Sequence, residues 1–408
     1  MFMKIQLSKM RNPLLLAFVL LAMLCSCSQE EVVILGDDDL VEIKIGVTHG
    51  TTVETKGVGT VGGMDDGVNN WDGQLIRVAM LHKGTLEYVQ EEGVNLLDHS
   101  VMLRTPKGKE DGAVVCVDGK IKYFPAQGAF DFWGYHLDNA AEGNDVRLND
   151  DKTDLRVAFR IDGSQDLMVA KAVPTAEDSL IMGESIDRAF SSYAARKGLA
   201  SGKAGALQPK LEFKHLLTRL VFQVVGGTAK VCQNGGSEIY VDSVKVRTKT
   251  KGDLVIAYLG AESKEQVAFD NAKEWTILKA RADEKVQNAD LVKMNPVVPA
   301  VGANGKPVPT DLGEALLVAP DVEYDIVVYL HQNVVATTDG KSEMKSYSYS
   351  TTLKNFNDEK AGFEHGKSYN VQISLWGLSQ ITITTKLDRW NDGGNIDMPI
   401  EDLDVPRI

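Results

Sequence analysis

Apolar and polar residues alternate with a period of two along much of this chain. The clearest examples are Val41, Ile43, Ile45 and Val47; Leu220, Phe222 and Val224; Tyr369, Val371, Ile373 and Leu375; and Ile381 with Ile383. Alternation of this kind, bounded by turn residues, is typical of half-buried antiparallel strands. Further strands are predicted at 74–81, 128–136, 243–248, 253–259 and 324–330. The pattern predicts an all-β protein built from β-sandwiches.

One segment has helical spacing instead. In "SIDRAFSSYAARKG" the apolar residues Ile186, Phe190 and Tyr193 recur every three to four positions, and Gly198 follows as a candidate C-cap. We therefore expect one short helix in this part of the chain.

The chain has 408 residues, of which 43% are hydrophobic, and this length favours two domains. The flexible stretch "LASGKAGALQPK" follows the predicted helix and ends in a segment suited to a domain boundary. We place an N-terminal β-sandwich at 27–207 and a C-terminal β-sandwich at 208–408, the latter including a tail at 391–408.

The first residues have the features of an export signal. Basic residues at Lys4, Lys9 and Arg11 precede the apolar run "LLLAFVLLAML", which is too short to span a bilayer as a helix. We interpret 1–26 as a signal peptide. Beyond it, no apolar run is long enough to span a membrane.

Cys27 is the predicted lipidation site. The sequence Leu24-Cys25-Ser26-Cys27 resembles a bacterial lipobox, with a small residue directly before the modified cysteine. The alternative is an ordinary cleavage site with two spare thiols. Two or three acyl chains, each stabilised by about 0.8 kcal/mol per buried methylene, hold a protein stably at a membrane. The acidic residues of "SQEE" after Cys27 resemble the signal that sends some lipoproteins to the outer face of the outer membrane.

The remaining cysteines bear on a possible disulfide, and the net charge bears on the class of binding partner. A disulfide between Cys116 and Cys232 is compatible with an oxidising compartment, but two buried single cysteines fit their wide separation better. The formal net charge of −13 argues against nucleic acid and anionic lipid head groups as partners.

The stretch "KGVGTVGGMDDG" places Gly57, Gly59 and Gly62 in the spacing of a dinucleotide-binding loop. That motif requires a strand directly before it, a helix directly after it, and an acidic residue about 20 positions on. None of these is present, and the acidic position is His82. We interpret 49–73 as a flexible exposed loop.

No catalytic group, cofactor site or metal site is predicted. The chain lacks G-x-S-x-G, H-E-x-x-H and C-x-x-C, and "GFEHGKS" misses the P-loop spacing and precedes a strand. An EF-hand loop begun at Asp388 would place Trp390 and Pro399 at ligand positions. The seven histidines have no metal-binding spacing, and we expect His215 to be a hydrogen-bonded structural residue.

Five motifs together resemble the fimbrillin family, the major and minor pilins of anaerobic Gram-negative bacteria. They are "YFPAQGAFDFWGYHLDN", "QDLMVAKA", "LEFKHLLTRLVFQV", "FEHGKSYNVQISLWGL" and "ITITTKLDRWNDGG", in this order within roughly residues 40–395. The physical interpretation of each motif is structural, since each contributes strand or turn residues.

The resemblance implies two tandem transthyretin-like β-sandwich domains with Greek-key-type connections, exported as a surface lipoprotein of the outer membrane. It also implies assembly with other pilin subunits into a fimbrium that contributes to adhesion. In this family a protease cuts after a basic residue behind the first strand, and a strand from a neighbouring subunit replaces it. Here the removable strand would be 40–48 and the cut would follow Lys56.

Two features depart from the family pattern. The protease that processes the best-known members of the family prefers arginine, but here no arginine lies between Arg11 and Arg77. Either a lysine-tolerant protease acts at Lys56, or the protein stays uncut as an anchored basal subunit. The tail offers Ile396, Met398 and Ile400 as donor-strand residues, but Pro399 and Pro406 lack the N–H that a strand between two others uses.

The competing interpretation is a non-polymerising surface lipoprotein that binds glycan. Such a protein needs exposed aromatic rings, for which Trp71, Trp275 and Trp376 are candidates. A ligand on a host or bacterial surface is a further candidate partner. The triplets "DSL" and "DSV" also resemble short O-glycosylation acceptors, at Ser179 and Ser243.

Overall fold

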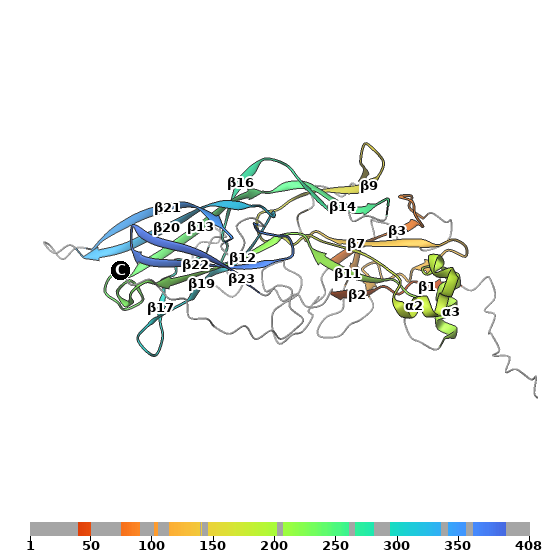
Figure 1. The fold of residues 1–408 in the computed structure, drawn as a ribbon, viewed down its shortest axis with the longest axis horizontal. Coiled ribbons are helices and arrows are strands. Elements are labelled where there is room, and N and C mark those ends of the chain that lie inside the picture. The colour runs from red at the N-terminus through yellow and green to blue at the C-terminus, as the bar shows by residue number, and fades with distance from the viewer. Residues whose placement is uncertain are drawn as a thin grey trace, which may run out of the picture.

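A computed structural model of the chain describes residues 40–49, 75–89, 102–104, 114–138, 140, 146–201, 207–260, 266–280, 294–335, 342–355 and 362–388. These residues form an elongated molecule of stacked β-sheets, with the helices at one end and the last strands toward the other (Figure 1).

A seven-stranded sheet organises the N-terminal part. Its spatial order is β2 (Gly46–His49), β11 (Lys210–His215), β10 (Met168–Lys171), β7 (Phe130–His136), β3 (Leu75–His82), β4 (Met102–Arg104) and β5 (Val115–Cys116). All pairings in it are antiparallel except that of β2 with β11, which is parallel. Every residue of β7 is buried, because the sheet is covered on both faces.

One face of this sheet carries a cluster that we call core 1. It includes Ile76, Phe130, Phe132, Met168, Leu211 and Phe213. Core 1 is closed by the two-stranded pair β1 (Val41–Glu42) and β6 (Tyr123–Phe124) and by three helical segments. These are α2 (Ala176–Met182), the 3₁₀ helix η1 (Gly183–Arg188) and α3 (Ser192–Ala200), which lie together at the right-hand end in Figure 1.

The opposite face carries core 3, which includes Trp133, Tyr135, Phe159, Val169 and Ile256. A second sheet covers it, in the order β15 (Val267–Phe269), β14 (Lys251–Tyr258), β9 (Asp154–Arg160) and β8 (Arg147–Leu148). Successive residues of β7 therefore serve two different cores, because neighbouring side chains of a strand point to opposite faces.

The C-terminal part is a sandwich of two four-stranded sheets around core 2, which includes Leu220, Phe222, Val246, Ile326, Tyr369 and Ile373. The first sheet has the order β19 (Thr310–Val318), β12 (Thr218–Gly226), β22 (Ser368–Gly377) and β23 (Gln380–Asp388). The second has the order β16 (Lys273–Ile277), β13 (Ile239–Lys249), β20 (Glu323–Val335) and β21 (Ser342–Lys354). A short 3₁₀ helix, η2 (Ala229–Val231), and the pair β17 (Ala300–Val301) and β18 (Pro307–Val308) lie beside it.

Strands β13 and β14 connect the two parts. Only Thr250 separates them, yet β13 belongs to the C-terminal sandwich and β14 pairs with β9 of the N-terminal part. Figure 1 shows them following one another along the length of the molecule. The strand pairings thus cross the predicted boundary at 207/208, and β11, which lies after that boundary, joins the N-terminal sheet. The division into two domains stays a prediction.

The all-β fold class is confirmed, as are the predicted strands at β3, β7, β13, β14 and β20. The transthyretin-like and Greek-key details stay predictions. The predicted helical segment is divided between η1 and α3, because Ser191 caps a new helix by accepting a hydrogen bond from the Ala194 N–H. Helix α2, which was not among the predicted elements, begins at a capping box of Thr175 and Asp178.

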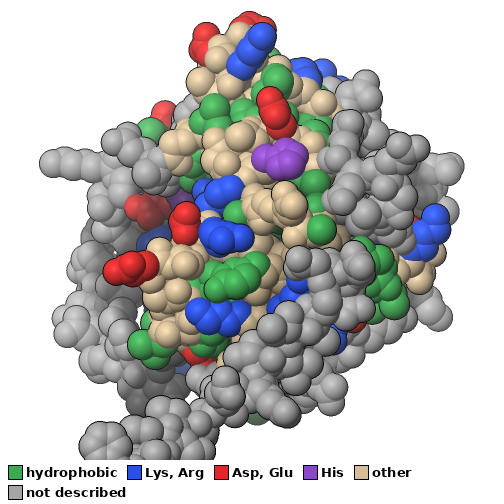
Figure 2. Space-filling model, turned by 90° about the vertical axis from the view of Figure 1, so that its right-hand side faces the viewer, with side chains coloured by type: hydrophobic (Ala, Val, Ile, Leu, Met, Phe, Trp, Pro, Cys, Tyr) green, Lys and Arg blue, Asp and Glu red, His purple; other side chains and the backbone are tan. Residues whose placement is uncertain are grey.

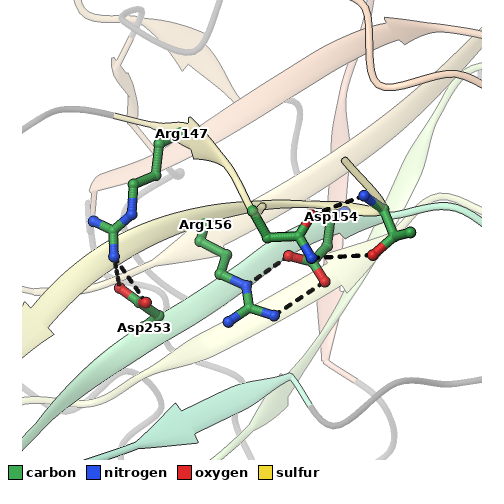
Figure 3. Close-up of polar contacts among 6 residues, drawn as sticks. Arg147, Asp154, Arg156 and Asp253 are labelled. Atoms are coloured by element: carbon green, nitrogen blue, oxygen red, sulfur yellow. Dashed lines mark hydrogen bonds and ion pairs between the residues drawn. The ribbon is translucent and has the colours of Figure 1, made fainter. Parts of the chain in front are cut away.

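Charged side chains lie along the sheet that covers core 3 (Figure 3). Arg147 on β8 lies directly opposite Arg156 on β9, and like charges in that position repel. Each guanidinium meets a carboxylate: Arg147 donates to both oxygens of Asp253 at 2.7 and 2.8 Å, and Arg156 donates to Asp154 at 2.6 and 3.2 Å. Asp253 comes from β14, so this contact too joins distant parts of the sequence.

Candidate assembly site

The first described segment, 40–49, is bonded along both of its edges. On one edge the Ile43 N–H donates to the Lys122 carbonyl at 2.8 Å, and the Ile45 carbonyl accepts from the Val114 N–H at 2.9 Å. On the other edge the Gly46 N–H donates to the Pro209 carbonyl at 3.0 Å, and β2 continues in parallel along β11. The segment therefore occupies a slot between the β6 side of core 1 and β11.

The Gln208 side chain holds the middle of this segment. Its Oε1 accepts a hydrogen bond from the Lys44 N–H at 3.0 Å, and its Nε2 donates to the Glu42 carbonyl at 3.1 Å. A primary amide offers one acceptor and two donors in one plane, so it imitates the backbone of a neighbouring strand where β11 has not yet begun. Gln208 lies in the stretch predicted to be a flexible linker, and no pattern in the sequence indicates this role.

Alternate side chains of the segment enter core 1. Val41, Ile43 and Ile45 are only 6%, 8% and 3% exposed, whereas Glu42 and Lys44 face solvent. The alternation seen in the sequence is thus an inside–outside alternation, and the aliphatic side chains belong to the same cluster as Phe124.

Helix α2 fixes the position of Gln208. Oδ2 of Asp178 closes the capping box with Thr175, while Oδ1 of Asp178 accepts from the Leu207 N–H at 2.9 Å. Leu207 is fully buried in the left-handed region with φ of 59°, a conformation that L-residues rarely adopt. The carboxylate therefore ties the helix to the residue directly before Gln208.

A buried polar group lies at the end of β7, β10 and β11. Nδ1 of His215 lies 2.6 Å from Oδ2 of Asp166, and Nε2 of His136 lies 3.3 Å from Oδ1 of Asp138. The Asp166 N–H donates to Oδ2 of Asp138 at 3.1 Å, which links the two pairs. The structural role expected for His215 fits this arrangement, and three of the five sequence motifs supply the four residues.

The pKa of His136 is raised from its ordinary value of 6.5. Complete burial acts to lower it, but the hydrogen bond and charge of Asp138, the Leu75 carbonyl and the charge of Asp166 together outweigh burial. Folding therefore stabilises the protonated form of His136 relative to the neutral form.

Most of the predicted site residues lie outside the described residues. These are the lipidation residue Cys27, the processing residue Lys56, the donor-strand residues Ile396, Met398 and Ile400, the aromatic candidate Trp71, and nearly all of the loop 49–73. They remain predictions.

The two described tryptophan candidates do not form one platform. Trp275 on β16 is 49% exposed and Trp376 on β22 is 48% exposed, but these strands belong to different sheets of the sandwich. The ring of Trp376 lies directly against Gly227, where a side chain would collide with it.

The remaining candidate modification residues are placed as follows. Cys116 on β5 and Cys232 after η2 are both free thiols, and burial raises the pKa of each. Ser179 is exposed on α2, and its hydroxyl donates to the Thr175 carbonyl at 3.0 Å. Ser243 is 8% exposed within β13, so its hydroxyl is a poor glycosylation acceptor in the folded chain.

The described surface suggests no other kind of site. Among the described residues, no three His, Cys, Asp or Glu side chains could jointly hold a metal ion, and none of the helices there is both long and apolar enough to cross a membrane. At the helix-bearing end of the molecule, the described basic and acidic side chains are intermixed (Figure 2).

These features define an all-β protein in which the segment 40–49, with β1 and β2 at its two ends, completes a core made by later strands. A model of the fimbrillin-like family matches residues 64–390, which is most of the chain. The chain therefore belongs to the fimbrillin-like family, and this membership supports a pilus-associated role in surface adhesion.

Solved structures with low similarity also match. A "putative cell adhesion protein" from Bacteroides uniformis is 13% identical with a TM-score of 0.40, over 86% of this chain and 98% of that chain. A protein with the same description from Bacteroides eggerthii is 11% identical with a TM-score of 0.38, over 86% and 96% of the two chains. The fimbrial anchor protein Mfa2 from Porphyromonas gingivalis is 8% identical with a TM-score of 0.29, over 85% and 99%. Similarities this low establish no function for this chain. No curated protein matches it.

Proposed function

We propose that this protein is a fimbrial subunit, exported as a lipoprotein through Cys27, anchored at the surface of the outer membrane and assembled by strand exchange. Cleavage after Lys56 releases the segment 40–49, and a strand from another subunit takes its place. The assembled fimbrium contributes to adhesion. Family membership favours this structural role over an enzymatic one.

The observation that supports the proposal best is the slot of the first strand. The segment is bonded along both edges, and three aliphatic side chains fill core 1. Burial of Val41, Ile43 and Ile45 contributes about 1.5–3 kcal/mol each as an upper estimate, whereas a whole domain is stable by about 5–15 kcal/mol. Loss of the strand without replacement would therefore leave this part of the chain close to unfolding, with an open edge that favours another strand.

The tail has the spacing that the slot requires. Ile396, Met398 and Ile400 are two residues apart, like Val41, Ile43 and Ile45. In that register Met398 takes the place of Ile43 and keeps an N–H for the Lys122 carbonyl, while Pro399 takes the place of Lys44.

The register limits the cost of Pro399. The Lys44 N–H bonds to the Gln208 side chain rather than to a backbone strand, so proline at this position removes one side-chain contact and no backbone pairing. Because Gln208 is only half-buried, water can bond to its Oε1 instead. A donor strand of this composition is therefore compatible with the slot.

Processing tests the proposal directly. Fimbriae isolated from cells should contain subunits that begin at Gly57, as measured by intact mass and amino-terminal sequencing. The variant Lys56→Ala should abolish detergent-resistant polymer, whereas Lys120→Ala, at an exposed lysine shortly after a turn, should leave it unchanged. Polymers that persist in K56A, with lipid still attached to Cys27 in every subunit, would refute processing at this residue.

A second candidate function is glycan binding without polymerisation. Trp275 and Trp376 are each about half exposed and offer two separate aromatic surfaces on which a sugar ring could stack. Retarded migration in polysaccharide-containing gels, lost in the double variant W275A/W376A, would support this function, and unchanged migration of the wild-type protein would exclude the glycans used.

A further inference from the structure

Strand β21 ends the second sheet of the C-terminal sandwich. It pairs with β20 from Ser342, opposite Val335, to Lys354, opposite Glu323, without a single shift in register. The strand order places β21 at the edge of its sheet. Within the described part of the chain, no strand pairs with its other edge.

Apart from Glu343 and Lys345 near its start, this edge lacks the features by which proteins usually block edge pairing. Edge strands are commonly short, interrupted by bulges, or protected by proline and charged residues. β21 contains no proline and no bulge, and its stretch 346–352, "SYSYSTT", carries no charge. Every residue from Ser342 to Ser348 is exposed, including Met344 at 65% and Tyr347 at 42%.

The free part of the edge has a definite end. The Thr385 hydroxyl of β23 donates to the Lys354 carbonyl at 2.7 Å, and Leu353 is buried in core 2. The stretch open to another strand is therefore 342–352, whose central residue is Tyr347.

We propose that this free edge pairs antiparallel with the same edge of a second copy of the chain, about a twofold axis at Tyr347. Such an isologous contact joins two four-stranded sheets into one continuous sheet. The opposed residues would be Ser342 with Thr352, Glu343 with Thr351, Met344 with Ser350, Lys345 with Tyr349, Ser346 with Ser348, and Tyr347 with itself.

The length of the free stretch favours a second copy in this register, because the axis at Tyr347 pairs all of 342–352 and brings no like charges together. With the axis at Tyr347, Glu343 and Lys345 both oppose uncharged residues, and two tyrosines meet at the centre, a favourable cross-strand pair. An axis at Lys345 would oppose two lysines. An axis at Tyr349 would pair Lys345 with the buried Leu353 and so needs the covered end of the strand.

This contact is separate from strand exchange. It uses a sheet that does not include β1, β2 or β11, and it requires no cleavage at Lys56. It would join subunits side by side, so that failure of one proposal leaves the other intact.

The test uses full-length, unprocessed protein carrying K56A in mild detergent, examined by sedimentation in density-matched buffer. The background protein should form dimers. S346K/S348K opposes lysine to lysine at two places and should raise the dissociation constant about tenfold or more. S346K/S348E introduces the same number of charges but opposes lysine to glutamate, so it should retain the dimer.

Both serines are exposed, so each double variant should keep the urea midpoint of the parent, which separates pairing from folding. The proposal is overturned if the parent protein is monomeric at about 100 µM, a concentration that exceeds typical micromolar dissociation constants. It is equally overturned if the two double variants dimerise alike, since that would mean a different register or occupant.

Discussion

Asp178 and Leu207 are joined by a hydrogen bond of 2.9 Å from the Leu207 N–H to the carboxylate of Asp178. The same carboxylate caps helix α2, and Leu207 directly precedes the glutamine that holds the first strand. Helix α2 thus fixes the position of Gln208, whose side chain bonds to the backbone of the segment 40–49.

Gln208→Ala should destabilise the protein by about 1–2 kcal/mol, because it removes two hydrogen bonds that typically contribute about 0.5–1.5 kcal/mol each. Urea unfolding measures this. Gln223→Ala is the matched control, since Gln223 makes a single side-chain bond to Asp311 at the surface, and it should cost about 0.5 kcal/mol or less. Equal effects of the two variants would argue that Gln208 does not hold the first strand.

Ile45→Ala should destabilise the protein by about 2–5 kcal/mol, because it leaves a cavity in core 1. Leu40→Ala, five residues earlier at a side chain that is 56% exposed, should change the free energy of unfolding by about 0.5 kcal/mol or less. Chemical denaturation of both variants distinguishes a strand that completes the core from one that only lies on the surface. A small effect of I45A would remove the energetic basis of strand exchange.

Gly134→Ala should destabilise the protein by about 1–3 kcal/mol, the usual cost of overpacking. A Cβ at Gly134 on β7 would lie 2.7 Å from Cζ of Phe213 and 2.9 Å from Cδ1 of Leu211, both buried on β11. Gly46→Ala is the control, since its Cβ would meet nothing closer than 3.5 Å. Thermal unfolding of both variants tests whether β11 belongs to the N-terminal sheet, and equal melting temperatures would contradict this placement.

His136 should make the free energy of unfolding depend on pH above about pH 6.5. Its pKa in the folded chain is raised above the ordinary 6.5, so protonation stabilises the fold. This contribution is complete below about pH 6.5 and is lost as pH rises through the folded pKa. The difference in unfolding free energy between wild type and His136→Gln should therefore shrink as pH increases beyond 6.5.

Asp138→Asn provides the companion variant, because Asp138 supplies the largest contribution that raises the pKa of His136. In the D138N background, H136Q should show little dependence on pH across the same range. A pH dependence of equal size in both backgrounds would show that Asp138 is not the source of the shift.

Local pattern in the sequence was enough for the fold class and for many of the strands, but β9, β19 and β21 were not predicted. Alternation at Val41, Ile43 and Ile45 and along 369–375 predicted which side chains would be buried, because a strand exposes its two faces in turn. β7 was predicted only as a strand, since burial on both faces leaves no alternation to show which core each of its residues joins.

The helical region shows where local pattern was insufficient. The apolar spacing of Ile186, Phe190 and Tyr193 was recognised, but the break before α3 depends on the Ser191 cap. The capping box of Thr175 and Asp178 was present in the sequence as T-x-x-D and was overlooked because the segment after it has little apolar periodicity.

The sequence by itself determined that the chain is all-β and which residues alternate between core and solvent, because these properties depend on neighbours along the strand. Only the tertiary structure decided that Gln208 holds Lys44, that β14 covers a sheet made earlier in the chain, and that β21 keeps an open edge. Those relationships join residues that are far apart in the sequence. Which strands pair, and in which register, depends on the three-dimensional arrangement, and the periodicity of a single strand carries no information about its partner.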